Sequence, residues 1–245
     1  MIKNTLENTK KATFYINVPS HLTREKGFPR PAGTGFFISK DGYCITARHV
    51  IEDKGLPKLI EGKLLSFQNE NNMLIQGVEI IEDWPQFDIV LMKANLDVLK
   101  EREYFKNKNS FDYLKIDYNI IPEGERVYSF GYPLSEAEIL SQPGMMIGIT
   151  KITPRITSAI ISSHHKAIGP IRTSNEPRYY VIDKALNYGN SGGPIVVEET
   201  GKVISVCTQF QPMRIPQQDG FVIMPSLYGI TSSLKNIEKD LTKLI

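Results

Sequence analysis

A glycine-rich segment around one serine, Gly189-Asn190-Ser191-Gly192-Gly193-Pro194, constrains the fold more than any other stretch. The apolar run at residues 195–197 follows it directly and predicts a strand. Glycines allow positive φ and close approach of the backbone, so a tight loop here can direct the Ser191 hydroxyl outward. It can also aim the N–H groups of Gly189 and Ser191 at one point, as an oxyanion hole requires. A simple turn between strands would give the same string, so a nucleophile needs a base and an acid elsewhere.

Two apolar runs upstream, residues 33–40 and 43–50, are joined by Asp41-Gly42. Asp-Gly between such runs is a strong hairpin signal, because both turn positions tolerate positive φ. The second run contains His49 near its end, and an imidazole is the commonest base for a serine hydroxyl. An isolated histidine is more often structural, so His49 is a candidate that its context must support.

A candidate acid, Asp88, stands directly before the apolar residues 89–91. Asp83 and Asp97 are alternatives in a poorer context. With Asp88, the order along the chain is His, Asp, Ser, which is the order of chymotrypsin-type enzymes. Subtilisin and the α/β-hydrolases place these residues in other orders.

On these residues the chain resembles a trypsin-like serine protease of the chymotrypsin fold, closest to the bacterial HtrA/DegP group. The resemblance extends from about Thr34 to Pro225. Four segments carry it: Gly33-Thr34-Gly35 with Thr46-Ala47-Arg48-His49-Val50; Asp88-Ile89-Val90-Leu91; Gly131-Tyr132-Pro133; and Asp183-Lys184-Ala185-Leu186-Asn187-Tyr188-Gly189-Asn190-Ser191-Gly192-Gly193-Pro194. Each segment alone is weak evidence for this family, but the order and spacing of the four segments together are specific to it.

The resemblance implies an all-β fold of two six-stranded antiparallel β-barrels, with the active site between them. We assign residues 1–112 to an N-terminal barrel carrying His49 and Asp88. Residues 113–245 then form a C-terminal barrel carrying Ser191 and a C-terminal helix. No PDZ module, which most HtrA proteins carry, is expected after it.

The polar residues 1–12 are expected to be flexible, and helical spacing of apolar residues places the C-terminal helix at about 226–245. Three segments are expected to be loops that could control activity: residues 134–144, 163–178 and 211–219.

The resemblance implies a serine endopeptidase that acts on proteins or peptides. Ser191 would be the nucleophile, His49 the general base, and Asp88 the group that orients the imidazole. The N–H groups of Gly189 and Ser191 would form the oxyanion hole. No cofactor or metal is expected, because His164-His165 without further ligands is more typical of a solvated loop.

Substrate selection is predicted from the segment before the nucleophile. The residues expected to bind substrate are Ala185, Leu186, Val206, Cys207 and Thr208. Ala185 stands where trypsin carries an acid, so a small or aliphatic P1 residue (the one before the cleaved bond) is expected. Because Asp219 is acidic, a residual preference for a basic P1 residue stays an alternative. Asn190 replaces the aspartate that digestive enzymes pair with a new N-terminus, so no zymogen cleavage is expected.

The composition of the chain limits which classes of function it is compatible with. With 29 basic and 27 acidic residues the chain lacks the excess of positive charge typical of nucleic-acid binding, and no apolar run has membrane-spanning length. Cys44 and Cys207 are expected to be buried thiols, and the disulfide that braces the histidine loop in secreted relatives is missing. The N-terminus has no apolar core of the signal-peptide kind. These features predict a cytoplasmic protein without membrane or nucleic-acid partners, and they leave a regulatory protein partner open.

Two other functions remain compatible with the sequence. A pseudoprotease would keep the double barrel as a peptide-binding scaffold, although such proteins normally lose a residue of the triad and none is lost here. An esterase would use the same acyl-transfer chemistry on small molecules.

Overall fold

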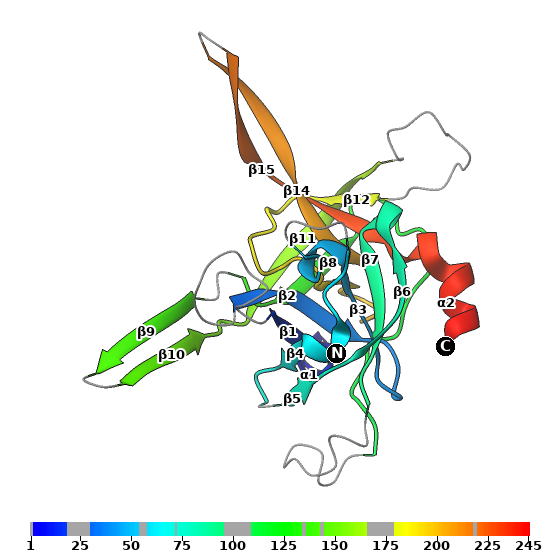
Figure 1. Cartoon of the computed structure of the whole chain (residues 1–245). Helices are drawn as coiled ribbons and strands as arrows, with labels where there is room; N and C mark the ends of the chain where they lie inside the picture. The colour runs from blue at the N-terminus through cyan, green and yellow to red at the C-terminus, as the bar shows by residue number, and fades with distance from the viewer. Residues whose placement is uncertain are drawn as a thin grey trace.

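A computed structural model describes residues 2–18, 30–53, 58–71, 73–95, 109–133, 136–142, 145–165, 179–217 and 220–245. Strands dominate this part of the chain, with a helix near each end (Figure 1). No helix among these residues is long and apolar enough to cross a membrane.

The first half forms one antiparallel sheet that curls without closing. Its seven strands lie in the order β5-β4-β1-β2-β3-β7-β6. Their bounds are β1 (Thr13–Val18), β2 (Arg30–Phe37), β3 (Tyr43–Ala47), β4 (Ser66–Gln68), β5 (Leu74–Gln76), β6 (Glu79–Trp84) and β7 (Ile89–Lys93). The hairpin predicted around Asp41-Gly42 is confirmed, because β2 and β3 pair from Phe37–Cys44 to Gly35–Thr46.

The second half contains a closed barrel in the order β11-β12-β15-β14-β13-β8. Its strands are β8 (Arg126–Gly131), β11 (Arg155–His165), β12 (Tyr179–Ile182), β13 (Pro194–Val197), β14 (Val203–Gln217) and β15 (Gly220–Ser233). The expectation of two closed six-stranded barrels therefore holds for one half only. In the other half β5 and β6 are the edges of the sheet and do not pair with each other.

Two hairpins project from the body of the molecule (Figure 1). One consists of β9 (Glu136–Gln142) and β10 (Met145–Lys151), and the other of the outer parts of β14 and β15. The prediction of loops at 134–144 and 211–219 is therefore wrong, because most of these residues belong to the strands of the two hairpins. The missed signals are Pro143-Gly144 and Asp219-Gly220, dipeptides typical of tight turns. Of the loop predicted at 163–178, residues 163–165 belong to β11 and 166–178 lie outside the described part.

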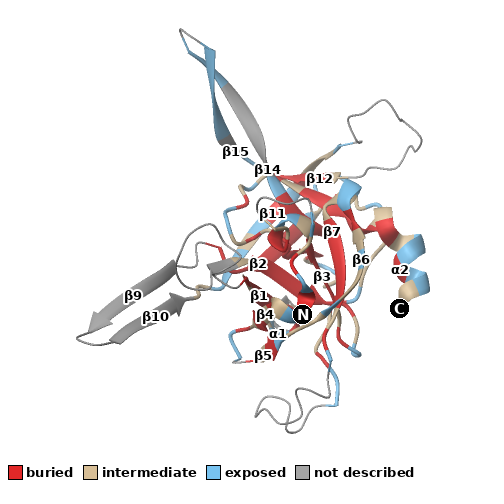
Figure 2. Ribbon diagram, in the orientation of Figure 1, coloured by how far each residue is buried: buried red, intermediate tan, exposed pale blue. Residues whose placement is uncertain are grey.

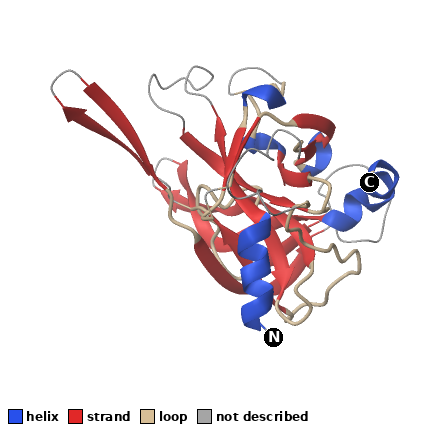
Figure 3. Ribbon diagram, turned by 90° about the horizontal axis from the view of Figure 1, so that it is seen from below, coloured by secondary structure: helices blue, strands red, loops and turns tan. Residues whose placement is uncertain are grey.

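The N-terminal residues form a helix, α1 (Ile2–Ala12), so the prediction of a flexible segment is wrong (Figure 3). Thr9 is fully buried, and its hydroxyl lies 2.9 Å from that of Tyr128 in β8. The buried face of α1 therefore includes a polar residue that is bonded to another element. The spacing of apolar residues alone does not indicate such a helix.

The C-terminal helix begins later than predicted. Residues 226–233 belong to β15, where Tyr180 of β12 pairs with Thr231. A 3₁₀ turn, η7 (Leu234–Ile237), then leads into α2 (Glu238–Leu244). Pairing within the barrel overrides the helical spacing of the short apolar window. The other 3₁₀ turns among the described residues are η2 (Arg48–Val50), η3 (Gly62–Leu64) and η4 (Pro85–Phe87).

The apolar core continues from the curled sheet into the barrel (Figure 2). One buried cluster joins Phe14 and Leu91 of the sheet to Val203 and Val206 of β14. The two halves therefore share a core along their seam, and groups that project from each half at this seam keep a fixed relative position.

Candidate active site

His49 and Asp88 are paired in the structure. The imidazole Nδ1 lies 2.7 Å from Asp88 Oδ2, and the His49 backbone N–H donates to Asp88 Oδ1 at 2.9 Å. Because the carboxylate is an acceptor, Nδ1 carries the hydrogen, and in the neutral imidazole Nε2 then keeps its lone pair. The His49 side chain is 40% exposed, so Nε2 can be reached from solvent.

Asp88 adopts an unusual backbone conformation to make these contacts. Its φ of 55° is the only positive φ of a non-glycine residue in the described part of the chain. It follows η4 directly, and its carbonyl accepts a hydrogen bond from Arg48 N–H at 3.0 Å. Asp88 thus holds the turn η2 through its carbonyl and both carboxylate oxygens.

Arg48 braces the histidine turn on its other side. Its Nε donates to Asp83 Oδ2 at 3.0 Å, and its Nη1 donates to Glu52 Oε1 at 2.6 Å. The alternative acid Asp83 is therefore bonded to Arg48, whereas the imidazole is bonded to Asp88. Asp97, the other alternative, lies outside the described residues.

The loop that carries Ser191 packs against the hairpin β2–β3. The Thr34 N–H donates to the Ser191 carbonyl at 2.8 Å. The Thr34 hydroxyl donates to the Gly189 carbonyl at 2.6 Å and accepts from Tyr132 N–H at 3.2 Å. The buried Thr34 therefore fixes two carbonyls of the loop, one on each side of Asn190.

Two glycines permit this close contact. A methyl group on Gly33 would lie 2.7 Å from the Ser191 carbonyl oxygen and 2.6 Å from a methyl of Val50, the residue after His49. On Gly192, whose φ is +83°, it would overlap the Thr34 carbonyl and approach Ala47 N to 2.9 Å. Ser191 is thus held against the backbone that leads into His49. Among the described residues, no hydrogen bond joins the Ser191 hydroxyl to the imidazole.

The N–H groups of the loop fall into two sets. The N–H of Asn190 donates to the Asn187 carbonyl at 3.0 Å. The N–H of Gly192 donates to the Cys207 carbonyl at 2.7 Å, and that of Gly193 donates to the Asn190 carbonyl at 2.8 Å. Those of Gly189 and Ser191 have no hydrogen-bond acceptor in the described part of the chain. The two predicted oxyanion donors are therefore the ones that the fold leaves available.

Comparison with known proteins shows the family of the chain. The sequence profile of the trypsin-like peptidase domain matches residues 33–206. The chain belongs to the trypsin-like peptidase family. This confirms the resemblance inferred from the sequence.

Curated relatives of this trypsin-like peptidase include bacterial proteins of greater length. It is 30% identical over 190 residues to a probable periplasmic serine endoprotease DegP-like of Bartonella henselae, covering 77% of this chain and 29% of that protein. It is 29% identical over 185 residues to the protein of the same name from Brucella suis, covering 74% and 28%. It is 26% identical over 207 residues to the uncharacterized protein y4bJ of Sinorhizobium fredii, covering 84% and 26%. The chain spans less than a third of the length of these relatives.

The prediction of a cytoplasmic location is wrong by this comparison, because the DegP-like relatives are named periplasmic. It rested in part on two free thiols. Both are buried, as predicted, and burial raises the pKa of the Cys207 thiol to about 12 and also raises that of Cys44. Thiols that are buried and protonated react poorly with oxidants, so their free state does not identify a reducing compartment.

Of the substrate-binding residues predicted on β14, Val206 and Cys207 are fully buried in the core. The Cys207 N–H donates to the Gly193 carbonyl, and its own carbonyl accepts from Gly192. Their side chains are therefore part of the packing of this trypsin-like peptidase. Thr208 is the first residue of β14 beyond these contacts, and its hydroxyl donates to the Ile230 carbonyl at 3.1 Å.

The other two predicted substrate-binding residues lie before the nucleophile loop. Leu186 is buried against Gly229 of β15, where a methyl group would lie 2.6 Å from Leu186 Cγ. Ala185 is half-buried. Leu186 thus fills space between its own segment and β15. Asp219 lies outside the described residues.

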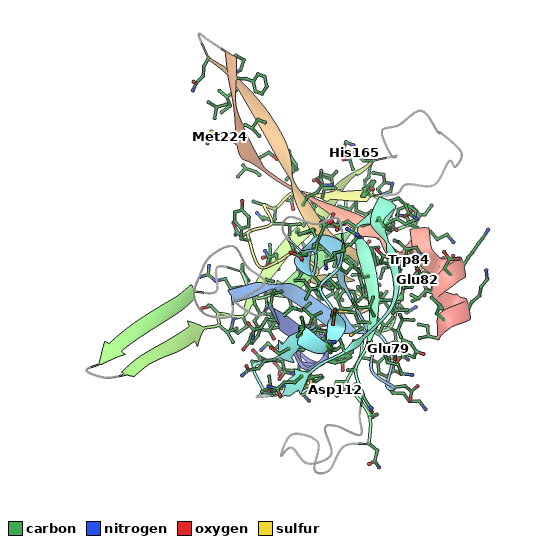
Figure 4. All side chains as sticks on the ribbon, viewed as in Figure 1. Glu79, Glu82, Trp84, Asp112, His165 and Met224 are labelled. Atoms are coloured by element: carbon green, nitrogen blue, oxygen red, sulfur yellow. The ribbon has the colours of Figure 1, made fainter. Side chains whose placement is uncertain are left out.

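The histidine pair at 164–165 lies at the end of β11, and Figure 4 places His165 at the edge of the molecule. His164 Nε2 is 2.9 Å from the Ile121 carbonyl oxygen, so it carries a hydrogen and is not available to a metal. The described residues contain no group of three or more potential metal-ligating side chains.

Sequence reasoning missed the supporting residues Thr34 and Arg48, although both stand in the segments that carried the resemblance. It also left Gly131-Tyr132 without a role. A methyl group on Gly131 would lie 3.1 Å from Asn190 Oδ1, and one on Gly189 would overlap the Tyr132 carbonyl. The loop that carries Ser191 therefore packs directly on the end of β8.

Replacing Asp88 with Asn should lower kcat by about four powers of ten at neutral pH. The amide N–H₂ would face Nδ1, so the imidazole would hold its hydrogen on Nε2 and could no longer accept a proton there. The matched control is Asp83→Asn, which disturbs Arg48 but not the imidazole. An equal loss in both variants would contradict the assignment of Asp88.

Replacing Thr34 with Val should lower kcat about 10- to 100-fold and change KM little, because the Gly189 carbonyl would lose its donor. Thr34→Ser keeps the hydroxyl and should restore most of the activity. The pH profile should not move, because the His49–Asp88 pair is untouched. Activity of the Val variant equal to that of the wild type would refute a positioning role for Thr34.

Proposed function

We propose that this chain is an active serine endopeptidase that hydrolyses peptide bonds through an acyl-enzyme on Ser191. The observation that carries the proposal is a combination of two features. The imidazole of His49 is already oriented by Asp88, and the loop of Ser191 presents two N–H groups that nothing in the described chain occupies. A scaffold protein has no need for either feature.

In the first half of the reaction, Ser191 Oγ bonds to the substrate carbonyl carbon as its proton passes to His49 Nε2. Asp88 stabilises the imidazolium through Nδ1. The N–H groups of Gly189 and Ser191 hold the oxyanion, which is the largest electrostatic contribution expected here. The C–N bond then breaks, and the amine leaves with the proton from His49.

In the second half, a water molecule gives a proton to His49 and bonds to the acyl carbon. The second tetrahedral oxyanion occupies the same two N–H groups. The ester bond then breaks, Ser191 recovers its proton from His49, and the carboxylic acid product leaves. Apart from the peptide substrate and this water molecule, the steps balance with groups of the chain alone.

We also propose that the enzyme works without zymogen cleavage. Asn190 is neutral and buried, and its backbone bonds to Asn187 and Gly193 shape the loop. An ion pair with a new N-terminal ammonium is therefore not needed to set the oxyanion hole.

The substrates proposed are proteins or peptides with a small or aliphatic P1 residue. Ala185 supplies no charge for a basic side chain, and Leu186 takes up space beside Gly229. Pairing of the substrate backbone with β14 would begin at Thr208, because the backbone of Cys207 is already bonded to the nucleophile loop.

An organophosphonate probe should attach to Ser191 in the wild type, and peptide mass mapping should locate it there. Ser191→Ala should remove both labelling and proteolysis of an unfolded protein while leaving the fold intact, with a residual rate several powers of ten lower. The control is Ser205→Ala, at a buried serine of β14 outside the loop. Absence of labelling in the folded wild type would favour a pseudoprotease, and hydrolysis of simple esters without peptide cleavage would favour an esterase.

Cleavage of a peptide library should show small or aliphatic residues at P1. Leu186→Ala should widen the accepted range towards larger aliphatic residues, because it removes the side chain that packs on Gly229. Strong selection for Arg or Lys by the wild type would contradict this specificity, and it would leave the proposed reaction intact.

A further inference from the structure

Asp88 stands at the end of a turn that has little packing of its own. The turn η4 contains no buried residue, and the Asp88 side chain is 32% exposed. The left-handed φ of Asp88 persists only where the surrounding structure holds it. Arg48 and His49 hold Asp88 itself, and its N–H donates to the Pro85 carbonyl at 3.2 Å. What fixes the rest of η4 therefore comes from contacts with other elements.

One such contact comes from the barrel. Tyr179 is the first residue of β12, and its hydroxyl donates to the Gln86 carbonyl, in the middle of η4, at 3.2 Å. The backbone of Tyr179 is paired on both sides, with His165 of β11 and with Ser232 of β15. Groups carried by strands are placed more precisely than groups carried by loops. The hydroxyl thus links η4 to a rigid element of the other half.

The second contact comes from the C-terminal helix. Trp84 is the last residue of β6 and directly precedes η4, and its indole N–H donates to Asp240 Oδ2 of α2 at 3.3 Å. The indole is buried in the same apolar cluster as Ile237 of η7 and Leu241 of α2. Figure 4 places Trp84 beside α2. The residue before η4 is therefore fixed both by burial and by a hydrogen bond to the helix.

The two contacts share an origin and a target. β12 and α2 belong to the half of the chain that carries Ser191, whereas η4 and His49 belong to the other half. Both contacts end within the four residues before Asp88. We propose that Tyr179 and Trp84 are positioning residues that hold the Asp88 carboxylate against the imidazole. This rests on the proposed function, and it adds that the half with the nucleophile aligns the acid and the base of the other half.

The test removes each contact with little change to the packing. Tyr179→Phe keeps the ring, and Asp240→Ala removes the acceptor of the indole N–H at an exposed position of α2. With a tetrapeptide p-nitroanilide that has valine at P1, each variant should show kcat about 3- to 10-fold lower and KM unchanged. This is the effect of losing one hydrogen bond that acts only through the base.

The matched control is Tyr43→Phe. It also removes a bonded hydroxyl, because Tyr43 Oη accepts from Lys93 Nζ at 3.4 Å. Tyr43 is the first residue of β3, and His49 follows the other end of that strand. The control should therefore leave kcat unchanged.

A proton resonance reports the positioning itself. The Nδ1–H of His49, bonded to a carboxylate, should give a signal far downfield of the amide protons in the wild type and none in Asp88→Asn. In Tyr179→Phe and in Asp240→Ala the signal should broaden through faster exchange with water, because the carboxylate covers this proton for less of the time. In the control it should be unchanged. A residue that only stabilises the fold would lower the melting temperature and leave the signal as it is.

Each contact is judged by its own variant. Wild-type kcat together with a wild-type signal would overturn the proposal for that contact. A rise in KM alone would also overturn it, because the residue would then act in substrate binding. So would a lower kcat with an unchanged signal, because the effect would not pass through the pair of His49 and Asp88.

The same signal separates this proposal from the proposed function, because the folded protein gives it whether or not a substrate is cleaved. Failure of the wild type to hydrolyse both the p-nitroanilide and an unfolded protein would refute the proposed function. The comparison of signals would still decide whether Tyr179 and Trp84 position Asp88, so the two failures are distinguishable.

Discussion

The contact between the backbone of Thr34 and that of Ser191 is the interaction on which the rest of the site depends. It joins the curled sheet to the barrel at Ser191, shortly before the nucleophile loop leads into β13. A methyl group on Gly33 or Gly192 would separate the two halves here, so the glycines on either side are a consequence of this single approach. The shared core behind the seam keeps the approach rigid.

The histidine turn is held by polar contacts of Asp88 and Arg48. The left-handed conformation of Asp88 costs about 1–2 kcal/mol for a residue with a side chain. A hydrogen bond to a charged group contributes about 1.5–3 kcal/mol, and Asp88 accepts two such bonds from His49 together with one at its carbonyl. The bonds outweigh the strain even with some loss to solvent. Arg48 adds ion pairs to Asp83 and Glu52.

Local patterns predicted the elements beside the nucleophile and the base: the apolar run at 195–197 lies in β13, and the hairpin around Asp41-Gly42 is β2–β3. The errors lie where long-range pairing decides the structure. Residues 226–233 fit a helix by spacing, but β12 provides a strand partner. The N-terminal helix is bonded to the barrel through the hydroxyls of Thr9 and Tyr128, which are far apart in the sequence. The role of Thr34 depends on two partners in the other half of the chain, so its own segment does not reveal it.

The idle N–H groups of Gly189 and Ser191 follow from how the loop distributes its bonds. Both residues are half-buried, so water can reach the loop and the groups carry no full penalty for burial. The carbonyls of the same two residues accept hydrogen bonds from Thr34. By contrast, the buried amide Nδ2 of Asn190 has no partner, and such a group costs about 1–3 kcal/mol. The backbone of Asn190 shapes the turn through its bonds to Asn187 and Gly193. In the proposed reaction an oxyanion would accept from these two N–H groups, and little reorganisation would be left for the reaction itself.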